Sequence, residues 1–568
     1  MEDYARTALV GMLTAAATGP ELAGVVGFVA GQGPVLDALV DDLCPVVVAL
    51  LQVGVGLAGR AAAGTVSLAQ AEEELRTSGR EMIRQTLQAV VDVASAAEER
   101  VPGGVAGPDG VRRTRVEDGH ARNVATVFGR ITMRRLAYRA PHAANVHPLD
   151  EVLEVPDGLY SPGLARLCAR ESVRGSFTDA ADAVEYATGV RIGTRQIIEL
   201  TRVAGRDADA FYADRSRTLP AAVPDDAVVI TADGKGVPVR PEALRPGTAK
   251  LAAKAKAKAK ASGTGGGGVS GGEGTLHGKA NRKRMAELVC VYDLAPVPRT
   301  VDDVLPDPAG DDETSVPTGA PAGGGDPEQA AVKAPKAAGK WLAASLVQDI
   351  PTVIAAGFDE ATRRDPGHDR DWIALVDGNT TQIEAITAEA ATREVDLTIL
   401  VDYLHVAGYV WDAAKALFCT DTVAGMTLAR TWVHERSRMI LQGCALEVAD
   451  RIRARVRDSK LTAAQRKSAL EAATYLTNKA PHLDYPTALA RGWPIATGVI
   501  EGACRHLVAD RLEITGARWG LDTAQAVLTL RAIIANDDFD DYWQYHRQQE
   551  HRRTYPGSTA SIAPALAA

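Results

Sequence analysis

Three apolar segments of the chain each end in an aspartate. They are residues 227–233, 372–377 and 397–402, which end in Asp233, Asp377 and Asp402. Each reads as a buried strand, and β/α folds place their sites at the carboxyl ends of strands. A single aspartate at such a position is more often a turn or cap residue. Three of them in order, followed by Glu501 on an expected helix, therefore favour one shared acidic site.

Carboxylates gathered in this way would suit divalent metal ions. If three antiparallel strands come first and a helix then returns the fourth parallel to the first, Asp233 and Asp377 lie about 5 Å apart, one strand spacing. Crowded carboxylates repel one another without cations. With Glu501 on a helix over the sheet, the set predicts a site for two Mg²⁺ (or Mn²⁺) ions about 4 Å apart, which activate a nucleophile and stabilise the leaving oxygen.

Four short motifs match a known family. They are Asp-Gly-Lys-Gly-Val at 233–237, Val-Asp-Gly-Asn at 376–379, Asp-Tyr-Leu-His at 402–405, and the block 498–511 with Gly-Ala-Arg-Trp at 516–519. Through them the chain resembles bacterial insertion-sequence transposases of the DDE (RNase H-like) class, distantly akin to the Mutator-like superfamily. The resemblance spans roughly residues 126–545 and is most specific in the last block.

The resemblance implies roles for particular residues. Asp233, Asp377 and Glu501 become the catalytic metal ligands. An Asp-x-x-His motif lies between the second catalytic aspartate and the glutamate in that superfamily, and it matches Asp402 and His405. This leaves Asp377 as the second ligand and Asp402 as the runner-up. His405 would orient a carboxylate or the scissile phosphate, or would be structural.

The patterns and the resemblance together predict an α/β protein. Its centre is an RNase H-like mixed β-sheet core with an all-α insertion, and helical and β-hairpin regions precede it. The expected domains are a helical N-terminal region (1–110), a β-hairpin with a helix-turn-helix-like DNA-binding region (111–222), the first part of the core (223–404) with low-complexity loops at 249–277 and 305–340, an all-helical insertion (405–495), the catalytic-Glu helix with a C-terminal helix (496–548), and a disordered tail (549–568).

DNA binding is expected from local rather than overall charge. The chain carries a formal net charge of -9, yet residues 111–140 hold eight arginines against only Glu117 and Asp118. A hairpin about Gly129 would present arginines on its polar face, where phosphate contacts dominate affinity. Two helices over 178–187 and 194–204, joined by a glycine-containing turn, form a helix-turn-helix candidate. The arginines expected to contact DNA are Arg130, Arg134, Arg135, Arg505, Arg511 and Arg518. For Arg505 the alternative is to hold the Glu501 carboxylate, and for Arg511 and Arg518 it is an intramolecular salt bridge to Asp510 or Glu513.

The expected cellular location rests on the N-terminal sequence, the cysteines and the most apolar stretch. Its N-terminus has no basic start of a signal peptide, and its six cysteines form no Cys-x-x-Cys pair, which fits a reducing cytoplasm. Residues 44–58 are the most apolar stretch but are interrupted by proline, glutamine and glycines. They predict a buried or partner-facing helix, with a membrane span as the minor alternative. We expect a cytoplasmic, nucleoid-associated protein without a membrane.

These expectations combine into one function with two alternatives. The chain is expected to bind double-stranded DNA at transposon terminal inverted repeats and target sites, to homo-oligomerise there, and to cleave and transfer strands. Trp411, Trp432 or Trp519 could stack on an unpaired base, although tryptophans are more often core residues. The first alternative is an RNase H-like nuclease or resolvase that only hydrolyses. The second is a non-catalytic, transposase-derived DNA-binding protein, against which the presence of all three acids argues.

Overall fold

The chain folds into two compact units. A computed structural model describes residues 33–215, 226–261, 283–306, 334–514 and 516–556. One unit comprises residues 1–214 and 539–568, and the other residues 215–538. The C-terminal helix α23 (Phe539–Thr554) therefore belongs with the N-terminal unit. The expected domain over 496–548 groups this helix with the Glu501 helix, whereas this division of the chain separates the two.

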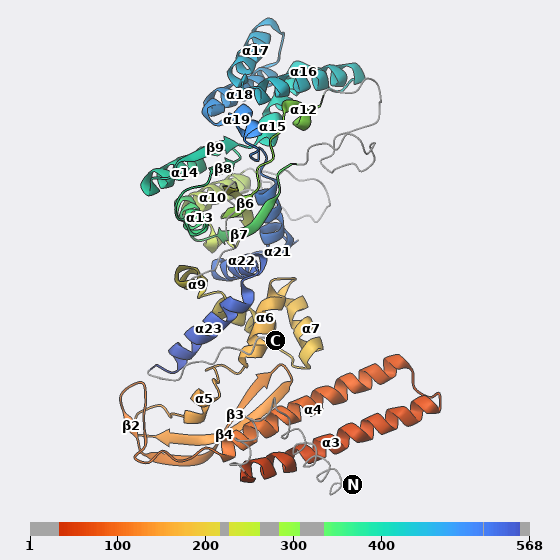
Figure 1. Cartoon of the computed structure of the whole chain (residues 1–568), viewed down its shortest axis with the longest axis vertical. Coiled ribbons are helices and arrows are strands. Elements are labelled where there is room, and N and C mark those ends of the chain that lie inside the picture. Colours follow the sequence, from red (N-terminus) through yellow and green to blue (C-terminus); the bar gives the residue numbers. More distant parts are fainter. Residues whose placement is uncertain (1–32, 216–225, 262–282, 307–333, 515, 557–568) are drawn as a thin grey trace. The chain divides into compact units, whose positions relative to one another are not determined.

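The first unit combines two long helices, a hairpin and a group of shorter helices (Figure 1). Its elements are α3 (Gly33–Ala62), α4 (Leu68–Ala96), β1 (Val105–Ala106), β2 (Arg112–Arg113), β3 (Arg115–Thr126), β4 (Gly129–Arg139), α5 (Pro148–Val152), α6 (Pro162–Ser172), α7 (Phe177–Thr188), α8 (Thr194–Ala204), α9 (Ala208–Asp214) and α23.

The β3–β4 hairpin turns where the sequence predicts. Its strands pair antiparallel from Thr126 opposite Gly129 to Arg115 opposite Arg139, with a register shift between Glu117 and His120. The alternating pattern at 126–139 thus marks mainly the second strand, and the first strand extends further upstream than expected. Buried residues of the hairpin, of α4 and of the segment after α5 form one core cluster. It comprises Val91, Val124, Ile131, Met133 and Val155.

Helices α6, α7 and α8 share one small core. The side chain of Ser176 caps α7 in a capping box with Asp179, and Gly189 ends that helix with φ 70°, a left-handed conformation that glycine adopts at low cost. Helix α8 then begins at Thr194, so both helices of the helix-turn-helix candidate form. Their common core comprises Ala125, Leu164, Cys168, Ala180, Val184, Val190, Ile192 and Ile197.

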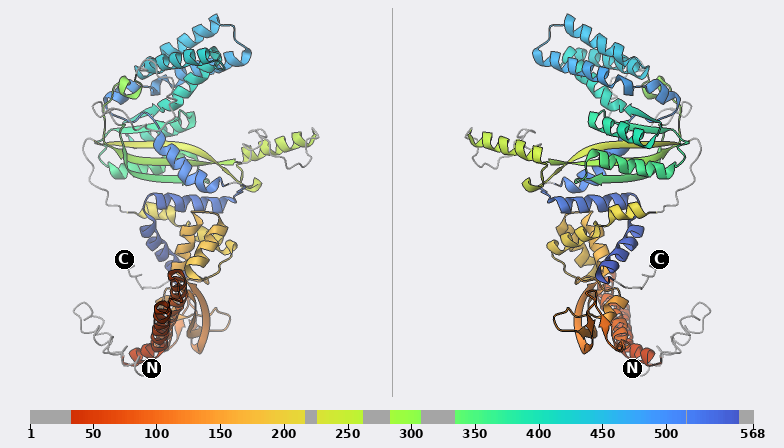
Figure 2. Two further views of the ribbon diagram at one scale, coloured as in Figure 1. Left: turned by 90° about the vertical axis from the view of Figure 1, so that its right-hand side faces the viewer. Right: turned by 90° about the vertical axis from the view of Figure 1, so that its left-hand side faces the viewer.

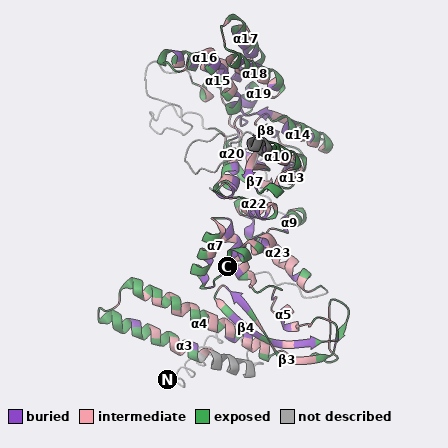
Figure 3. Cartoon of the chain, turned by 180° about the vertical axis from the view of Figure 1, so that it is seen from behind, coloured by how far each residue is buried: buried purple, intermediate pink, exposed green. Residues whose placement is uncertain are grey.

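Helix α3 contains the apolar stretch. Pro45–Ala62 is the one helical segment in the described part of the chain that is long and apolar enough to cross a membrane, by length and composition alone. Only 11% of this window is buried, and much of α3 is drawn as exposed (Figure 3). The expectation of a buried helix was therefore wrong, and the partner-facing interpretation stays a prediction.

The second unit is built on a five-stranded mixed sheet with helices around and after it (Figures 1 and 2). Its elements are β5 (Ala227–Pro238), η2 (Pro241–Ala243), α10 (Pro246–Ala261), β6 (Lys283–Leu294), α12 (Val301–Val304), β7 (Ala337–Ser345), α13 (Ile350–Arg364), β8 (Trp372–Val376), α14 (Thr380–Arg393), β9 (Leu397–Val401), α15 (Tyr403–Leu417), α16 (Val423–Leu441), α17 (Ala445–Asp458), α18 (Ala463–Lys479), η3 (Ala480–His482), α19 (Tyr485–Ala490), α20 (Gly498–Ala503), the π-helix η4 (Cys504–Ala509), α21 (Asp510–Leu512) and α22 (Leu521–Ala535).

The strand order of this sheet is β7-β6-β5-β8-β9. Strands β5, β6 and β7 pair antiparallel, and β8 lies parallel to both β5 and β9. Strands β5, β8 and β9 coincide with the three apolar segments that end in aspartate, and β6 covers a further apolar run at 286–292. Helix α13 connects the antiparallel part to β8, as the sequence predicts. The expectation of a mixed α/β protein with a helical region after the sheet is confirmed.

The two faces of β5 have different neighbours. A β-carbon at Gly357 of α13 would lie 2.6 Å from Val289 and 3.6 Å from Ile230, so only glycine lets this helix approach the sheet so closely. Side chains alternate along a strand. Asp233, three residues after Ile230, therefore points to the opposite face, where the Cys504 thiol of η4 contacts it.

Two of the expected loops are partly regular. The lysine- and alanine-rich residues 249–261 lie in helix α10, which stands away from the sheet (Figure 2), because both residue types favour helix. Residues 337–340 belong to β7, and the tail expected from 549 is helical to Thr554. The remainder of these predictions lies largely at 262–282, 307–333 and 557–568, outside the described residues.

Candidate active site

Asp233 and Asp377 occupy equivalent positions on neighbouring parallel strands. The register pairs Ala232 of β5 with Val376 of β8, so the aspartate that follows each lies at the same edge of the paired region. Strand β5 itself continues to Pro238 against β6. Asp233 thus lies where the parallel pairing stops rather than where the strand ends. Neighbouring strands lie about 4.8 Å apart, so the two carboxylates share one edge of the sheet as predicted.

The Asp233 carboxylate is half-buried and has few donors. Its Oδ1 accepts a hydrogen bond from the Gly234 amide at 2.6 Å, and its Oδ2 accepts one from the Cys504 thiol at 3.3 Å. Burial raises the pKa of Asp233, and the charge of Asp377 adds to this rise. The two hydrogen bonds and the charge of Lys235 only partly offset this rise.

Glu501 lies near this edge on the helix that follows the helical region. It lies in α20, three residues before Cys504, which contacts Asp233. The chain then forms the π-helix η4, a distortion that often marks functional sites. Glu501 and Arg505 are exposed, whereas Val508 and Leu512 are buried, so Arg505 lies on a different face of this segment from those two residues.

Asp402 has a different environment from the other acids. Its side chain is 1% exposed. One oxygen caps α15 by accepting from the amides of Leu404 and His405, and the other accepts from the amide and the hydroxyl of Thr497. Thr497 is the residue from which α20 begins. Asp402 therefore joins β9 to the helix that carries Glu501, and this geometry favours a positioning role.

His405 lies in a group of aromatic rings beside the Asp377 turn. Its imidazole is 5.7 Å from the Tyr409 ring and 6.2 Å from the Tyr475 ring, between centroids. The Tyr475 hydroxyl donates to the Asp377 carbonyl at 3.0 Å. Burial raises the pKa of Tyr475, and neighbouring Tyr409 and Asp377 add to the rise. The phenol therefore stays a neutral donor.

Sequence reasoning missed Cys504 at this site, and it missed a buried acid nearby on the other face of the sheet. Glu287 of β6 lies opposite Gly234, and a β-carbon at Gly234 would come within 3.3 Å of its carboxylate. Burial raises the pKa of Glu287, Arg245 partly offsets this, and Asp233 raises it further. The available signal was an acid within the apolar run 286–292. Cys504 gave no signal, because its contact with Asp233 depends on how η4 packs on the sheet.

The donor set fits a hard divalent cation. Asp233, Asp377 and Glu501 offer only carboxylate oxygens, which Mg²⁺ and Mn²⁺ prefer. None of the three forms an ion pair with another described residue. Their oxygens are not all within 4.8 Å of one another. The absence of ion pairs around these acids is therefore the observation that favours bound cations at this edge of the sheet.

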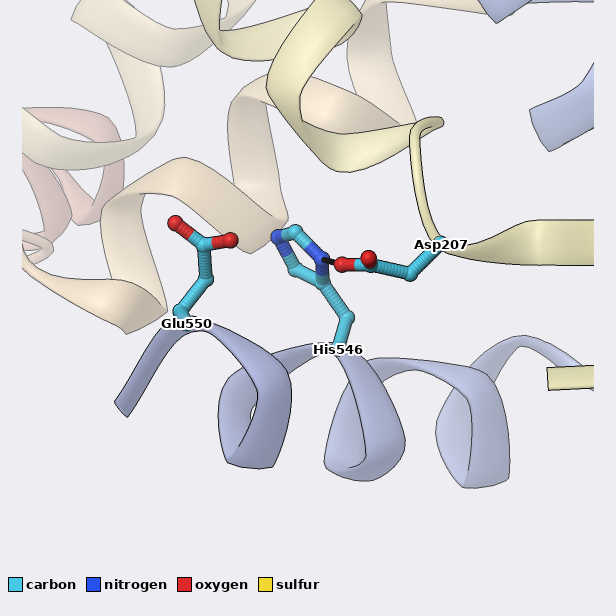
Figure 4. A group of neighbouring side chains, drawn as sticks. All are labelled: Asp207, His546 and Glu550. Atoms are coloured by element: carbon cyan, nitrogen blue, oxygen red, sulfur yellow. Dashed lines mark hydrogen bonds and ion pairs between the residues drawn. The ribbon is translucent and has the colours of Figure 1, made fainter. Parts of the chain in front are cut away.

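A tighter cluster of possible ligands lies in the first unit. Asp207, His546 and Glu550 have ligand atoms within 4.8 Å of one another, and the three side chains converge (Figure 4). His546 Nδ1 lies 2.6 Å from the Asp207 carboxylate, Arg553 pairs with both acids, and Arg206 pairs with Glu550. Cations of the chain already neutralise this cluster. We interpret it as a structural network that fixes α23 against α8 and α9.

The arginines expected to bind DNA divide into two groups. Arg130, Arg134, Arg505 and Arg518 are exposed. Arg505 lies 3.9 Å from Asp510, its one ion-pair partner in the described part of the chain.

The other two arginines are buried. Arg135 is 9% exposed and pairs with Asp150, and Arg511 is 2% exposed with its guanidinium over the Trp519 ring. A phosphate on the surface cannot reach these two, so their assignment as DNA contacts is corrected.

Comparisons with known proteins add no relative to this description. No family model matches the sequence, and no curated protein matches it either.

Proposed function

We propose that this protein is a DNA transposase of the DDE class. The observation that carries the proposal is the register that sets Asp233 of β5 beside Asp377 of β8, with Glu501 three residues before Cys504, whose thiol contacts Asp233. None of the three carboxylates forms an ion pair with another described residue. Two divalent ions held there would activate a nucleophile and stabilise the leaving oxygen of a phosphodiester.

The sheet supports an RNase H-like core for this enzyme. Three antiparallel strands come first, α13 follows, and β8 returns parallel to the first strand at the centre of the order β7-β6-β5-β8-β9. The helical elements α15–α19 lie between β9 and α20. This is the position at which the resembling enzymes carry an all-α insertion before the catalytic glutamate.

Each residue then has a distinct task. Asp233, Asp377 and Glu501 hold the metal ions, and Asp402 holds Thr497 and so places the Glu501 helix. The Cys504 thiol fixes one oxygen of Asp233. Outside the metal site, exposed arginines would position DNA by its phosphates, which fixes register without reading sequence.

The test is an assay of the purified full-length protein on labelled duplex DNA. The DNA carries the ends that flank its own gene, together with unlabelled target DNA. We expect strand cleavage at the end of the repeat, and joining to target, with Mg²⁺ or Mn²⁺ and neither with EDTA. Cleavage without joining would support a nuclease or resolvase. Binding without cleavage would support a non-catalytic DNA-binding protein.

The hairpin gives a separate prediction about duplex binding. Replacing Arg130 and Arg134 by alanine removes up to two phosphate contacts. The slope of log affinity against log salt should therefore shrink by up to about 1.8, at roughly 0.9 per contact. The readout is fluorescence anisotropy of end DNA over a salt series. Arg430→Ala with Lys340→Ala removes two exposed cations elsewhere and should leave the slope unchanged. An unchanged slope in the hairpin variant would exclude this surface.

A further inference from the structure

An open groove lies beside the Asp377 turn in the second unit. Its volume is 850 Å³, within the roughly 300–1,000 Å³ of ligand clefts. Helices α15 and α18 form it. The side chains that line it are Tyr409, Ala463, Arg466, Lys467, Leu470, Glu471, Thr474 and Tyr475.

Two stacked tyrosines connect this groove to the proposed metal site. The rings of Tyr409 and Tyr475 lie 3.8 Å apart at an angle of 15°. Tyr475 donates its hydroxyl to the Asp377 carbonyl at 3.0 Å. Gly378 has φ +91°, and a β-carbon there would come within 2.4 Å of the Tyr475 oxygen. The aromatic end of the groove therefore packs directly on the turn that carries a proposed metal ligand.

The groove also borders the most basic part of the helical region. Residues 451–467 hold seven arginines and lysines and a single acid, Asp458, in a chain of net charge -9. Arg457, Lys460, Arg466 and Lys467 are all exposed. The 3.7 Å pair between Lys467 and Glu471 joins side chains that are 76% and 62% exposed, and such pairs contribute little. Arg466 and Lys467, which line the groove, are therefore the cations that a phosphate beside the tyrosines could contact.

We propose that this groove binds the single-stranded DNA that adjoins the scissile phosphate. Sites for unpaired nucleic acid combine aromatic rings, on which bases stack, with cations that follow the phosphates. Bases within a duplex cannot offer their faces to Tyr409, so the tyrosines select an unpaired strand. This inference rests on the proposed function, because it takes the Asp377 turn as the place where the DNA strand would be cut.

The experiment measures binding of a labelled oligothymidylate to the full-length protein in EDTA, where no cleavage occurs. Tyr409→Ala should weaken binding by about tenfold, on the order of the loss of one stacked base. Tyr409→Phe keeps the ring and should bind like the parent. Arg466→Ala with Lys467→Ala should shrink the salt slope by up to about 1.4, at roughly 0.7 per contact on single strands. Arg430→Ala with Lys340→Ala serves as the matched control.

Two further measurements separate the possible occupants. Heparin, an anion without stackable bases, should bind Tyr409→Ala as well as it binds the parent. If Tyr409→Ala weakened the binding of heparin and oligothymidylate equally, the groove would bind anions without base stacking, and the proposal would be overturned. Unchanged oligothymidylate affinity and slope in both groove variants would overturn it as well.

The outcome is distinguishable from the fate of the transposase proposal. If the protein binds oligothymidylate through Tyr409 but does not cleave end DNA, the groove proposal stands and the transposase proposal fails. If the protein cleaves end DNA while the groove variants bind oligothymidylate like the parent, the transposase proposal stands and the groove proposal fails.

Discussion

Replacing Asp377 by asparagine should abolish metal-dependent nicking of end DNA, by about a thousandfold or more, on the order of the loss when a catalytic group is removed. The Asp377 Oδ1 accepts from the Asn379 amide at 2.8 Å, and an asparagine oxygen can do the same. The turn should therefore survive while the charge that holds the metal is lost. Binding of end DNA should persist or tighten slightly, because Arg130 and Arg134 lie in the other unit and a negative charge has gone.

The measurement compares cleavage rates and anisotropy for Asp377→Asn and its parent on the same DNA. Asp396→Asn is the matched control, since Asp396 is exposed and precedes β9 at the opposite end of the sheet from Asp377. It should cleave like the parent. An Asp377→Asn protein that still nicks at near the parent rate would move the second catalytic acid to Asp402.

Buried strands were the most predictable part of the fold. The runs that became β5, β6, β8 and β9 are apolar enough to indicate their positions from local sequence alone. Strand β7 was missed because it follows a segment rich in proline, glycine and alanine. Its stability comes from elsewhere in the chain, since Asn536 hydrogen-bonds both the amide and the carbonyl of Leu342. A contact across 194 residues leaves no local pattern.

The candidate site was predictable to the extent that it depends on strand ends. The strand-end rule brought Asp233 and Asp377 together, and the register places them as expected. The rule could not separate Asp377 from Asp402, because both follow a buried strand. Their difference is tertiary: Thr497 donates to Asp402 across 95 residues, and Asp377 has no such partner among the described side chains.

Local charge was the least reliable guide to the residues that could contact DNA. Arg135 and Arg511 looked like surface cations, but Asp150 and Trp519 hold them in buried positions. The basic run at 451–467 was passed over, although it is visible in the sequence. Its relevance appears only once α18 brings Tyr475 beside the Asp377 turn. The stacked tyrosines are 66 residues apart (409 and 475), so no spacing rule joins them.

Replacing Asp402 by alanine should destabilise the second unit by about 3–5 kcal/mol, because a helix cap is lost and buried donors lose their acceptor. Those donors are the amides of Leu404 and His405 and both donor groups of Thr497. The measurement is the urea midpoint of the full-length protein, followed by a signal from the second unit. Asp484→Ala is the control. It removes the exposed cap of α19 and should cost about 1 kcal/mol without affecting cleavage.

The asparagine variant separates positioning from metal binding. An asparagine at position 402 can still cap α15 through its oxygen, but its amide group would face the donors of Thr497. We expect a loss of about 1–3 kcal/mol, the cost of unsatisfied buried donors, and slower cleavage because α20 no longer holds Glu501 in place. The slower rate should come with normal binding of end DNA. If Asp402→Ala instead unfolded at the parent midpoint and cleaved nothing, Asp402 would be a metal ligand, and the positioning role argued from its burial would be wrong.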